Sequence, residues 1–199
     1  MSFDVIWSIV SLILSPFYFT VNVVDLFTGL YSAEYLYGEG KELIDRHTMS
    51  TLCMFRVVNI EDINIKYCRE LGNKVITKVA QYIKENISKE YIFVRYMGPK
   101  FVIVFSGVEE GSVEEFLRTL KDEIETIEIV EETEAVEKTR IINGKEERYV
   151  EEAQSVSASP LINIVVSTYY KGTGLEQLTK RLEEYLDTAD KTENQINYI

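Results

Sequence analysis

The segment 91–105, with the sequence YIFVRYMGPKFVIVF, restricts the folds open to this chain more than any other. Two apolar, β-rich runs flank residues 97–100, where an adjacent glycine and proline favour a turn. The segment therefore predicts a buried β-hairpin. Apolar runs of the same kind at 51–60 and 161–170 predict a central strand and one further buried strand. The core of this chain must therefore contain a sheet.

Segments with helical periodicity alternate with these strands. We expect a capped turn that begins at Asp25 and leads into a short helix to about Asp45, and further helical segments over residues 61–87, 112–127 and 175–188. Gly72 is expected to divide the segment 61–87 into two helices, because glycine weakens a helix interior. Strands that alternate with helices indicate a mixed α/β (α+β) fold with helices packed around one sheet.

Composition narrows the classes of function. The 199 residues suffice for one domain of ordinary size, and 33 acidic against 21 basic residues give a net charge of −12. This balance argues against a nucleic-acid-binding protein, which needs a basic surface. The two cysteines lack the spacing of a zinc site, and the lone His47 argues against histidine-based metal binding or catalysis.

Residues 128–160 differ in composition from the rest of the chain. Nine glutamates and four basic residues in 128–152 give this stretch a net charge of −5. Asn143-Gly144 is a strong signal for a type I′ turn, so we expect a charged hairpin that places Arg140 opposite Glu147. Residues 155–160 are expected to form a flexible return. A solvated ribbon without function and a ribbon that docks a protein partner both agree with this pattern.

The N-terminal segment 1–24 contains an uncharged run of twenty residues, 5–24. That length matches a membrane-spanning helix of roughly 20 residues. The alternative is an apolar helix that packs on this domain or on a second copy, which would make the protein a homo-oligomer. In the first case we expect the domain on the cytoplasmic face of the membrane, and in the second case in the cytoplasm.

The element order and four short motifs resemble the GGDEF domain of diguanylate cyclases. The resembling segments are Asp25–Leu30 (family D-x-L-T-G-L), Ile63–Ile65 (I-N-D), Gly72-Asn73 (G-D) and Arg95–Phe101 (R-Y-G-G-D-E-F). The resemblance covers residues 25–199 and is interrupted by the insertion at about 128–160. It implies a ferredoxin-like palm of the nucleotidyl cyclase type, with a central and mostly antiparallel sheet.

The resemblance also assigns the metal positions of the family to residues that do not bind metals. Diguanylate cyclases attack the α-phosphate of GTP with a 3′-hydroxyl, assisted by two divalent ions that carboxylates hold. Here the strand aspartate falls on Arg56, and the two acids of the hairpin signature fall on Pro99 and Lys100. Charged Arg and Lys offer no lone pair to a metal. The resemblance therefore predicts no metal site, no cofactor and no cyclase activity.

The family positions define a vestigial nucleotide pocket of five residues: Arg56, Asn64, Asn73, Gly98 and Lys100. Asn64 keeps the first guanine-reading residue of the family, whereas Asn73 replaces its carboxylate by an amide. The C-terminal phosphate-binding cations of the family leave only Lys191 as a candidate. The inhibitory R-x-x-D motif falls on Ser88–Tyr91, which lacks both the arginine and the aspartate of the motif.

Each of these residues also has a structural explanation. Asn64 could cap or turn the chain, and Asp25 could cap a turn. Arg56 and Lys100 are expected to face each other across neighbouring strands, where they could pair with Glu61, Asp62 or another acid, or hold an anion.

Two functions follow from these alternatives. The first is a catalytically inactive GGDEF-like regulatory or scaffolding module that binds an unidentified protein partner. The second is a non-catalytic receptor for a nucleotide or another anionic ligand in the vestigial pocket.

Overall fold

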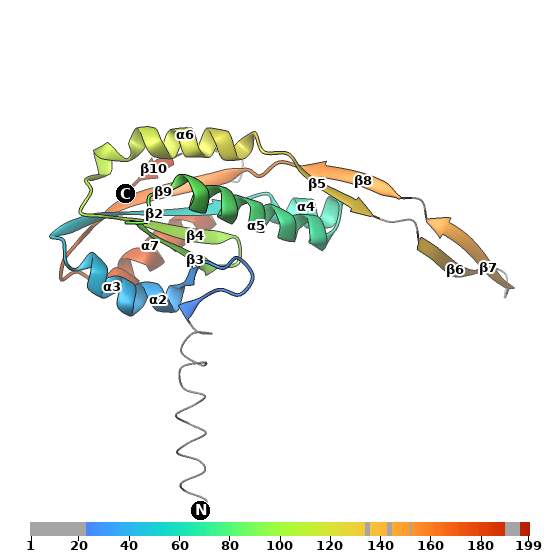
Figure 1. The fold of residues 1–199 in the computed structure, drawn as a ribbon, viewed down its shortest axis with the longest axis horizontal. Coiled ribbons are helices and arrows are strands. Elements are labelled where there is room, and N and C mark those ends of the chain that lie inside the picture. Colours follow the sequence, from blue (N-terminus) through green and yellow to red (C-terminus); the bar gives the residue numbers. More distant parts are fainter. Residues whose placement is uncertain (1–22, 134–135, 143–144, 152, 190–195) are drawn as a thin grey trace, which may run out of the picture.

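A six-stranded sheet organises the computed structural model (Figure 1), which describes residues 23–133, 136–142, 145–151, 153–189 and 196–199. The strand order is β1-β3-β4-β2-β9-β10. The two outermost pairs, β1 with β3 and β10 with β9, are parallel, and the three inner pairs are antiparallel. This mixed α+β architecture with a mostly antiparallel sheet confirms the predicted fold class.

The main strands and helices occur in the predicted order along the chain. The strands of the central sheet are β1 (Tyr31–Ser32), β2 (Met49–Val57), β3 (Ile92–Met97), β4 (Lys100–Ser106), β9 (Ile162–Tyr170) and β10 (Ile196–Tyr198). The helices are α2 (Ala33–Tyr37), α3 (Glu39–Ile44), α4 (Ile60–Lys66), α5 (Arg69–Asn86), the 3-10 turn η1 (Glu110–Ser112), α6 (Glu114–Glu125) and α7 (Leu175–Thr188). The predicted helix over 175–188 is confirmed at both ends.

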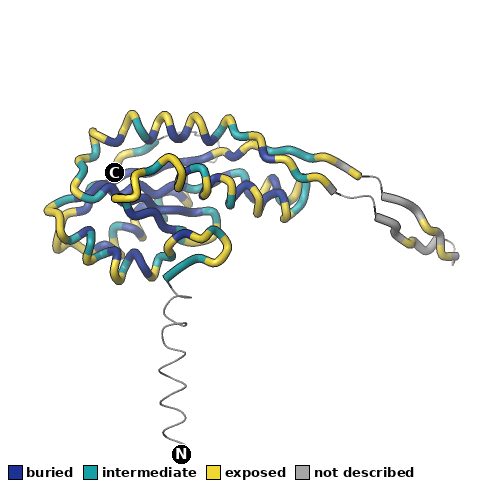
Figure 2. Tube along the Cα trace, viewed as in Figure 1, coloured by how far each residue is buried: buried dark blue, intermediate teal, exposed yellow. Residues whose placement is uncertain are grey.

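Helices cover both faces of the sheet because its central strands are apolar on both sides. Phe55 and Val57 of β2 belong to the core beneath α4, α5 and α6, whereas Leu52 and Met54 belong to the core beneath α2, α3 and α7. Successive side chains of a strand point to opposite faces, so one apolar run supplies two cores. Figure 2 shows the buried residues concentrated along the sheet and on the inner sides of the helices.

The predicted hairpin is confirmed as β3 and β4. Gly98 in its turn has a φ of 56°, a conformation that glycine adopts without steric cost. The register shifts between Arg95 and Met97, which marks a β-bulge next to the turn. The hairpin thereby places Lys100 at the start of β4, directly opposite Arg56 of β2.

The predicted helix break at Gly72 is wrong. The interruption lies at Tyr67 and Cys68, between α4 and α5, and Gly72 lies within the first turn of α5. A Cβ atom on Gly72 would sit 2.0 Å from Oδ1 of Asn64 on α4. The glycine therefore lets α4 approach α5 closely and does not end a helix.

The region before β2 is more divided than the sequence predicted. One short helix was expected to about Asp45, but the structure forms two helices, α2 and α3, separated at Gly38. The short strand β1 precedes them and pairs with β3. Strand β10 was not predicted either, because its three residues lack a local apolar pattern.

The insertion forms a two-part antiparallel ribbon that projects away from the sheet (Figure 1). Its base pairs β5 (Ile129–Thr133) with β8 (Gln154–Ala158), and its outer part pairs β6 (Val136–Ile142) with β7 (Lys145–Glu151). The register confirms Arg140 opposite Glu147. The turn at Asn143-Gly144 lies outside the described residues.

The expected flexible return over 155–160 is wrong, because most of it belongs to β8. Residues 154–158 are held by the ladder with β5. The base of the ribbon is fixed to the domain by the buried Ile129 and by an ion pair from Lys74 of α5 to Glu131, 2.6 Å long. The ribbon is therefore ordered where it leaves the domain.

Most of the N-terminal run 5–24 lies outside the described residues. Its last two residues contact the domain: Val23 packs against the α2–α7 core, and Val24 forms a β-bridge with Tyr31. Over the part of the chain that the structure describes, no helix is both long enough and apolar enough to cross a membrane.

Candidate functional site

Two cations lie side by side where β2 and β4 meet. Arg56 and Lys100 are cross-strand partners in the antiparallel ladder, as the sequence predicted. Lys100 is only 8% exposed, which is rare for a lysine. A buried ammonium needs charged or polar partners, because desolvation disfavours the charged form.

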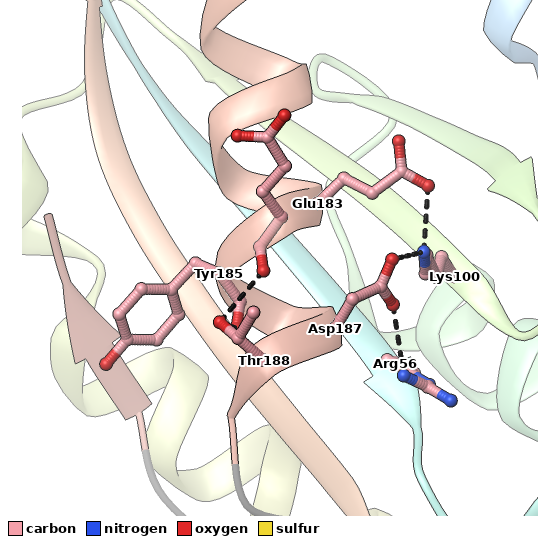
Figure 3. Close-up of polar contacts among 7 residues, drawn as sticks. Arg56, Lys100, Glu183, Tyr185, Asp187 and Thr188 are labelled. Carbon is pink, nitrogen blue, oxygen red and sulfur yellow. Dashed lines mark hydrogen bonds and ion pairs between the residues drawn. The ribbon is translucent and has the colours of Figure 1, made fainter.

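The partners come from α7, which crosses this end of the sheet (Figure 3). Nζ of Lys100 donates to Oε1 of Glu183 and to Oδ2 of Asp187, each at 2.8 Å. Nη1 of Arg56 donates to the other oxygen of Asp187 at 3.0 Å. We call these four residues the charge cluster. Its two cations and two carboxylates balance one another.

The expected pairing of Arg56 and Lys100 with nearby acids is confirmed in kind, but the acids come from α7 rather than from Glu61 or Asp62. The sequence around Lys100 could not have paired it with these acids, since 83 and 87 positions separate Lys100 from Glu183 and Asp187. The available signal was two acids four positions apart, which lie on one face of a helix.

Arg56 also carries an unmatched donor. Its Nε is buried and has no hydrogen-bond partner, although Nη1 is paired. The opposite neighbour of Arg56 on β9 is Asn163, which is 2% exposed. Lys100, Arg56 and Asn163 thus form a polar row across three strands. Charged and amide groups replace apolar side chains at this end of an otherwise apolar sheet.

The hairpin turn beside the charge cluster is held by hydrogen bonds to two of its backbone carbonyl groups. Nε of Arg95 donates to the carbonyl oxygen of Gly98 at 3.0 Å, and the amide of Val57 donates to the carbonyl of Pro99 at 3.1 Å. Gly98 is exposed, and so is the neighbouring Met97, at 58%. These contacts fix the turn on the end of β2, so Lys100 enters the sheet at a defined position.

Asn64 and Asn73 lie on the opposite side of the sheet from the charge cluster. Asn64 belongs to α4, and its Oδ1 is buried against Gly72 without a hydrogen-bond partner. Asn73 is exposed on α5. The structure therefore brings Arg56 and Lys100 together on one face of the sheet. It places Asn64 beside the start of α5 on the other face. Lys191 lies outside the described residues.

Asp25 caps the turn that precedes β1. Its Oδ1 accepts from both the amide and the hydroxyl of Thr28, at 2.8 and 2.6 Å, and from Nη1 of Arg95 at 3.0 Å. Burial alone would raise the pKa of this carboxyl, but the hydrogen bonds from Thr28 and Arg95 lower it below its ordinary 3.8. The predicted capping role of Asp25 is confirmed, and Arg95 fixes the turn to β3.

The sequence of this domain matches a known family. The family model described as "Diguanylate cyclase, GGDEF domain" matches residues 22–145. The chain belongs to the GGDEF family. The match covers β1 to β4, α2 to α6 and the first half of the ribbon, and thus includes both cations of the charge cluster.

Solved structures of low sequence identity share the fold of this GGDEF domain. The diguanylate cyclase SiaD from Pseudomonas aeruginosa, solved with its activator SiaC, has a TM-score of 0.68 at 15% identity, over 98% of this chain and 70% of that one. The FimX GGDEF domain from the same organism has a TM-score of 0.66 at 16% identity, over 90% and 100% of the two chains. The GGDEF domain of DgcB from Caulobacter crescentus, solved with c-di-GMP, has a TM-score of 0.66 at 14% identity, over 88% and 92%.

The charge cluster of this GGDEF domain does not fit a divalent metal ion. A hard cation such as Mg²⁺ needs oxygen ligands, whereas Arg56 and Lys100 present only N–H donors. The two carboxylates that are present already accept hydrogen bonds from these cations. Among the described residues, no group of three or more His, Cys, Asp or Glu side chains could hold a metal ion. The donor set is therefore that of an internal ion-pair network.

Proposed function

We propose that this GGDEF domain is catalytically inactive and serves as a regulatory or scaffolding module through protein–protein interaction. The observation that carries the proposal is the charge cluster. The family resemblance assigns Lys100 to one acidic position of the signature and Arg56 to the strand position. Carboxylates of α7 pair with both cations. Two-metal phosphoryl transfer needs carboxylates that are free to bind the ions, and these cations supply none.

The proposal is tested by incubating the purified full chain with GTP and Mg²⁺ or Mn²⁺ and measuring cyclic di-GMP by mass spectrometry. We expect no product above the background of a chain-free control. The matched variant Asn64→Ala should give the same result, because there is no activity to lose. Turnover by the wild-type chain that disappears in Asn64→Ala would overturn the proposal.

The ribbon supports the part of the proposal that concerns a protein partner. Its outer ladder, β6 with β7, extends beyond the helices in Figure 1. Among the residues that the structure describes, each of these strands pairs only with the other, so each keeps a second edge that can accept another strand. SiaD, one of the similar structures, was solved in complex with an activator protein. We propose the ribbon as the docking element of this chain.

We also propose that residues 1–24 attach the domain to the cytoplasmic face of the membrane. The support is the uncharged run 5–24, whose twenty residues match the apolar thickness of a bilayer. The domain begins directly after this run, since Val24 already pairs with Tyr31. Membrane attachment would place the domain at the lipid surface and leave the ribbon available to a partner. Association of two copies through the same segment would instead give a homo-oligomer.

The receptor function has weaker support from the geometry. An anionic ligand at Arg56 and Lys100 would have to displace Glu183 and Asp187, which already neutralise both cations. A nucleotide at Asn64 would meet an amide oxygen that is turned onto Gly72. A thermal-shift series with GTP, GDP and cyclic di-GMP separates the two functions. We expect no shift, and a saturable shift that Asn64→Ala removes would favour the receptor.

A further inference from the structure

A cavity of about 390 Å³ lies between the turn at residues 24–31 and the segment 84–93. Its apolar floor contains Leu30 and Phe93, both of which are buried. Val24 and Tyr31 form one wall, and the end of α5 forms the other. The cavity is distinct from the charge cluster, whose residues do not line it.

The charge of this cavity is opposite to that of the protein. Lys84 and Lys89 line it, both are exposed, and none of its described lining residues is acidic. The chain as a whole has a net charge of −12, so a lining with two ammonium groups and no carboxylate is unusual here. Nζ of Lys84 donates a hydrogen bond of 3.2 Å to the carbonyl oxygen of Gly29. Its remaining donors can reach an anion outside the protein.

Large apolar side chains are exposed on the turn beside the cavity. Leu26 is 80% exposed, Phe27 is 42% exposed and Tyr31 is 44% exposed. The turn is rigid, since the amide of Asp25 donates to the carbonyl of Leu30 at 2.8 Å and the Asp25 carboxylate is fixed by Arg95. A fixed turn cannot withdraw these side chains from water. A group of exposed apolar residues beside two cations is typical of a surface that binds an amphiphile.

The position of this surface in the chain indicates its occupant. Val24 lines the cavity and is also the last residue of the uncharged run 5–24. If that run enters a bilayer, the cavity and the exposed turn lie at the lipid headgroups, within a few residues of the point of entry. We propose that the turn 24–31 together with Lys84 and Lys89 is a membrane-contact surface. Leu26 inserts beside the headgroups, and the two lysines bind the phosphates of anionic lipids.

This inference rests on the proposed membrane attachment but makes a separate claim. An apolar span alone binds neutral and anionic bilayers alike, whereas the two lysines add a preference for anionic lipid. The attraction of a lysine to an anionic surface corresponds to about a fivefold change in partitioning, so two lysines give roughly thirtyfold. Because the attraction is electrostatic, it must weaken as salt rises.

The experiment measures partitioning of the full chain onto vesicles of phosphatidylcholine alone or with 30 mol% phosphatidylglycerol, at low and high salt. We expect about thirtyfold stronger partitioning onto the anionic vesicles at low salt. The variant Lys84→Glu/Lys89→Glu should lose this preference and still bind both kinds of vesicle. The matched control is Lys78→Glu/Lys171→Glu, which changes the net charge equally at exposed lysines outside the cavity and should keep the preference.

The outcomes separate the two claims. Equal loss of the preference in both double variants would show that net charge alone is responsible and would overturn the inference. Equal binding of the wild-type chain to both kinds of vesicle would also overturn it and leave membrane attachment standing. Absence of binding to either vesicle would overturn membrane attachment itself. Circular dichroism melting of each variant tests whether the charge changes leave the fold intact.

Discussion

Lys100 connects the hairpin to α7 through two charged hydrogen bonds. Its ammonium lies between Glu183 and Asp187, and the side chain of Glu183 is 17% exposed. Removal of one partner from such a cluster leaves carboxylates without their cation, which costs more than the cluster contributes as a whole. We therefore expect a structural role for Lys100, at the position where the family resemblance places an acid.

The variant Lys100→Met tests this role. Methionine keeps most of the side-chain length but leaves Glu183 and Asp187 with Arg56 as the remaining cation. We expect the free energy of unfolding to fall by about 2 kcal/mol, less than for a fully buried pair because Asp187 is 46% exposed. Urea unfolding at pH 7 measures this change.

Two further variants serve as a partial rescue and as a control for Lys100→Met. Lys100→Met/Glu183→Gln should recover part of the loss, since it removes one of the unpaired charges. Lys180→Met removes an exposed lysine 3.9 Å from Glu184 and should change stability by less than about 0.5 kcal/mol. A loss for Lys100→Met no larger than for Lys180→Met would contradict a structural role for the charge cluster.

Asp25 gives a prediction about pH. Its pKa in the folded protein lies below the ordinary 3.8, because hydrogen bonds from Thr28 and Arg95 outweigh the effect of burial. A lowered pKa means that this carboxylate stabilises the fold above about pH 4, and that this contribution is lost as the pH falls through the folded-state pKa. Asp25→Asn should therefore be less stable than wild type at pH 6, by about 1 kcal/mol at most for a partly exposed group.

The measurement is urea unfolding of both proteins between pH 2 and pH 7. The difference in free energy between wild type and Asp25→Asn should shrink as the pH falls below 4. Other carboxyls titrate in both proteins and cancel in this difference. A difference that grows toward low pH would refute the assignment.

At the scale of elements, the ribbon differs from the rest of the fold because it extends away from the domain and contacts it at its base. Its base is tied to α5 through Ile129 and the Lys74–Glu131 ion pair, whereas its outer ladder extends away from the helices. An isolated two-stranded hairpin is marginally stable in water. The outer ladder therefore contributes little to the stability of the domain and is suited to a docking role.

The register of the base shows where the ribbon can be shortened. Thr133 of β5 pairs with Gln154 of β8. Replacing residues 134–153 by a two-residue Asn-Gly turn keeps this pair and the whole β5–β8 ladder. We expect the free energy of unfolding to change by less than about 1 kcal/mol, because none of the described core residues belongs to the stretch that is replaced. Cross-linking followed by affinity capture from native membranes should recover less partner with the shortened chain than with the full chain.

The control for this capture is Lys78→Glu, a single charge change outside the ribbon. Equal partner recovery by the shortened chain and this control would place the docking site elsewhere. A large loss of stability in the shortened chain would instead assign the outer ladder to the core.

Across the whole molecule, the sequence predicted what local patterns encode. The apolar runs located β2, β4 and β9, and the amphipathic period located α7 at both ends. The errors arose where distant parts of the chain decide the outcome. Gly72 serves a contact with α4 that no local pattern reveals, and β10 exists because β9 offers it an edge. The family resemblance predicted that Arg56 and Lys100 face each other, but their partners on α7 depend on the folded arrangement.

The attachment of the domain is tested by truncation. The structure refines the boundary, because Val23 and Val24 contact the domain and belong with it. We therefore expect a chain that begins at residue 23 to keep its fold, since both core clusters are built from described residues that this chain retains. If residues 1–22 hold the protein at the membrane, the truncated chain moves to the soluble fraction after cell lysis, and the full chain stays with the membranes until detergent is added. A truncated chain that aggregates, beside a full chain that is soluble without detergent, would show that this segment packs on protein. The charge cluster would be unaffected by that result, because α7 and the hairpin form it without any residue of the segment.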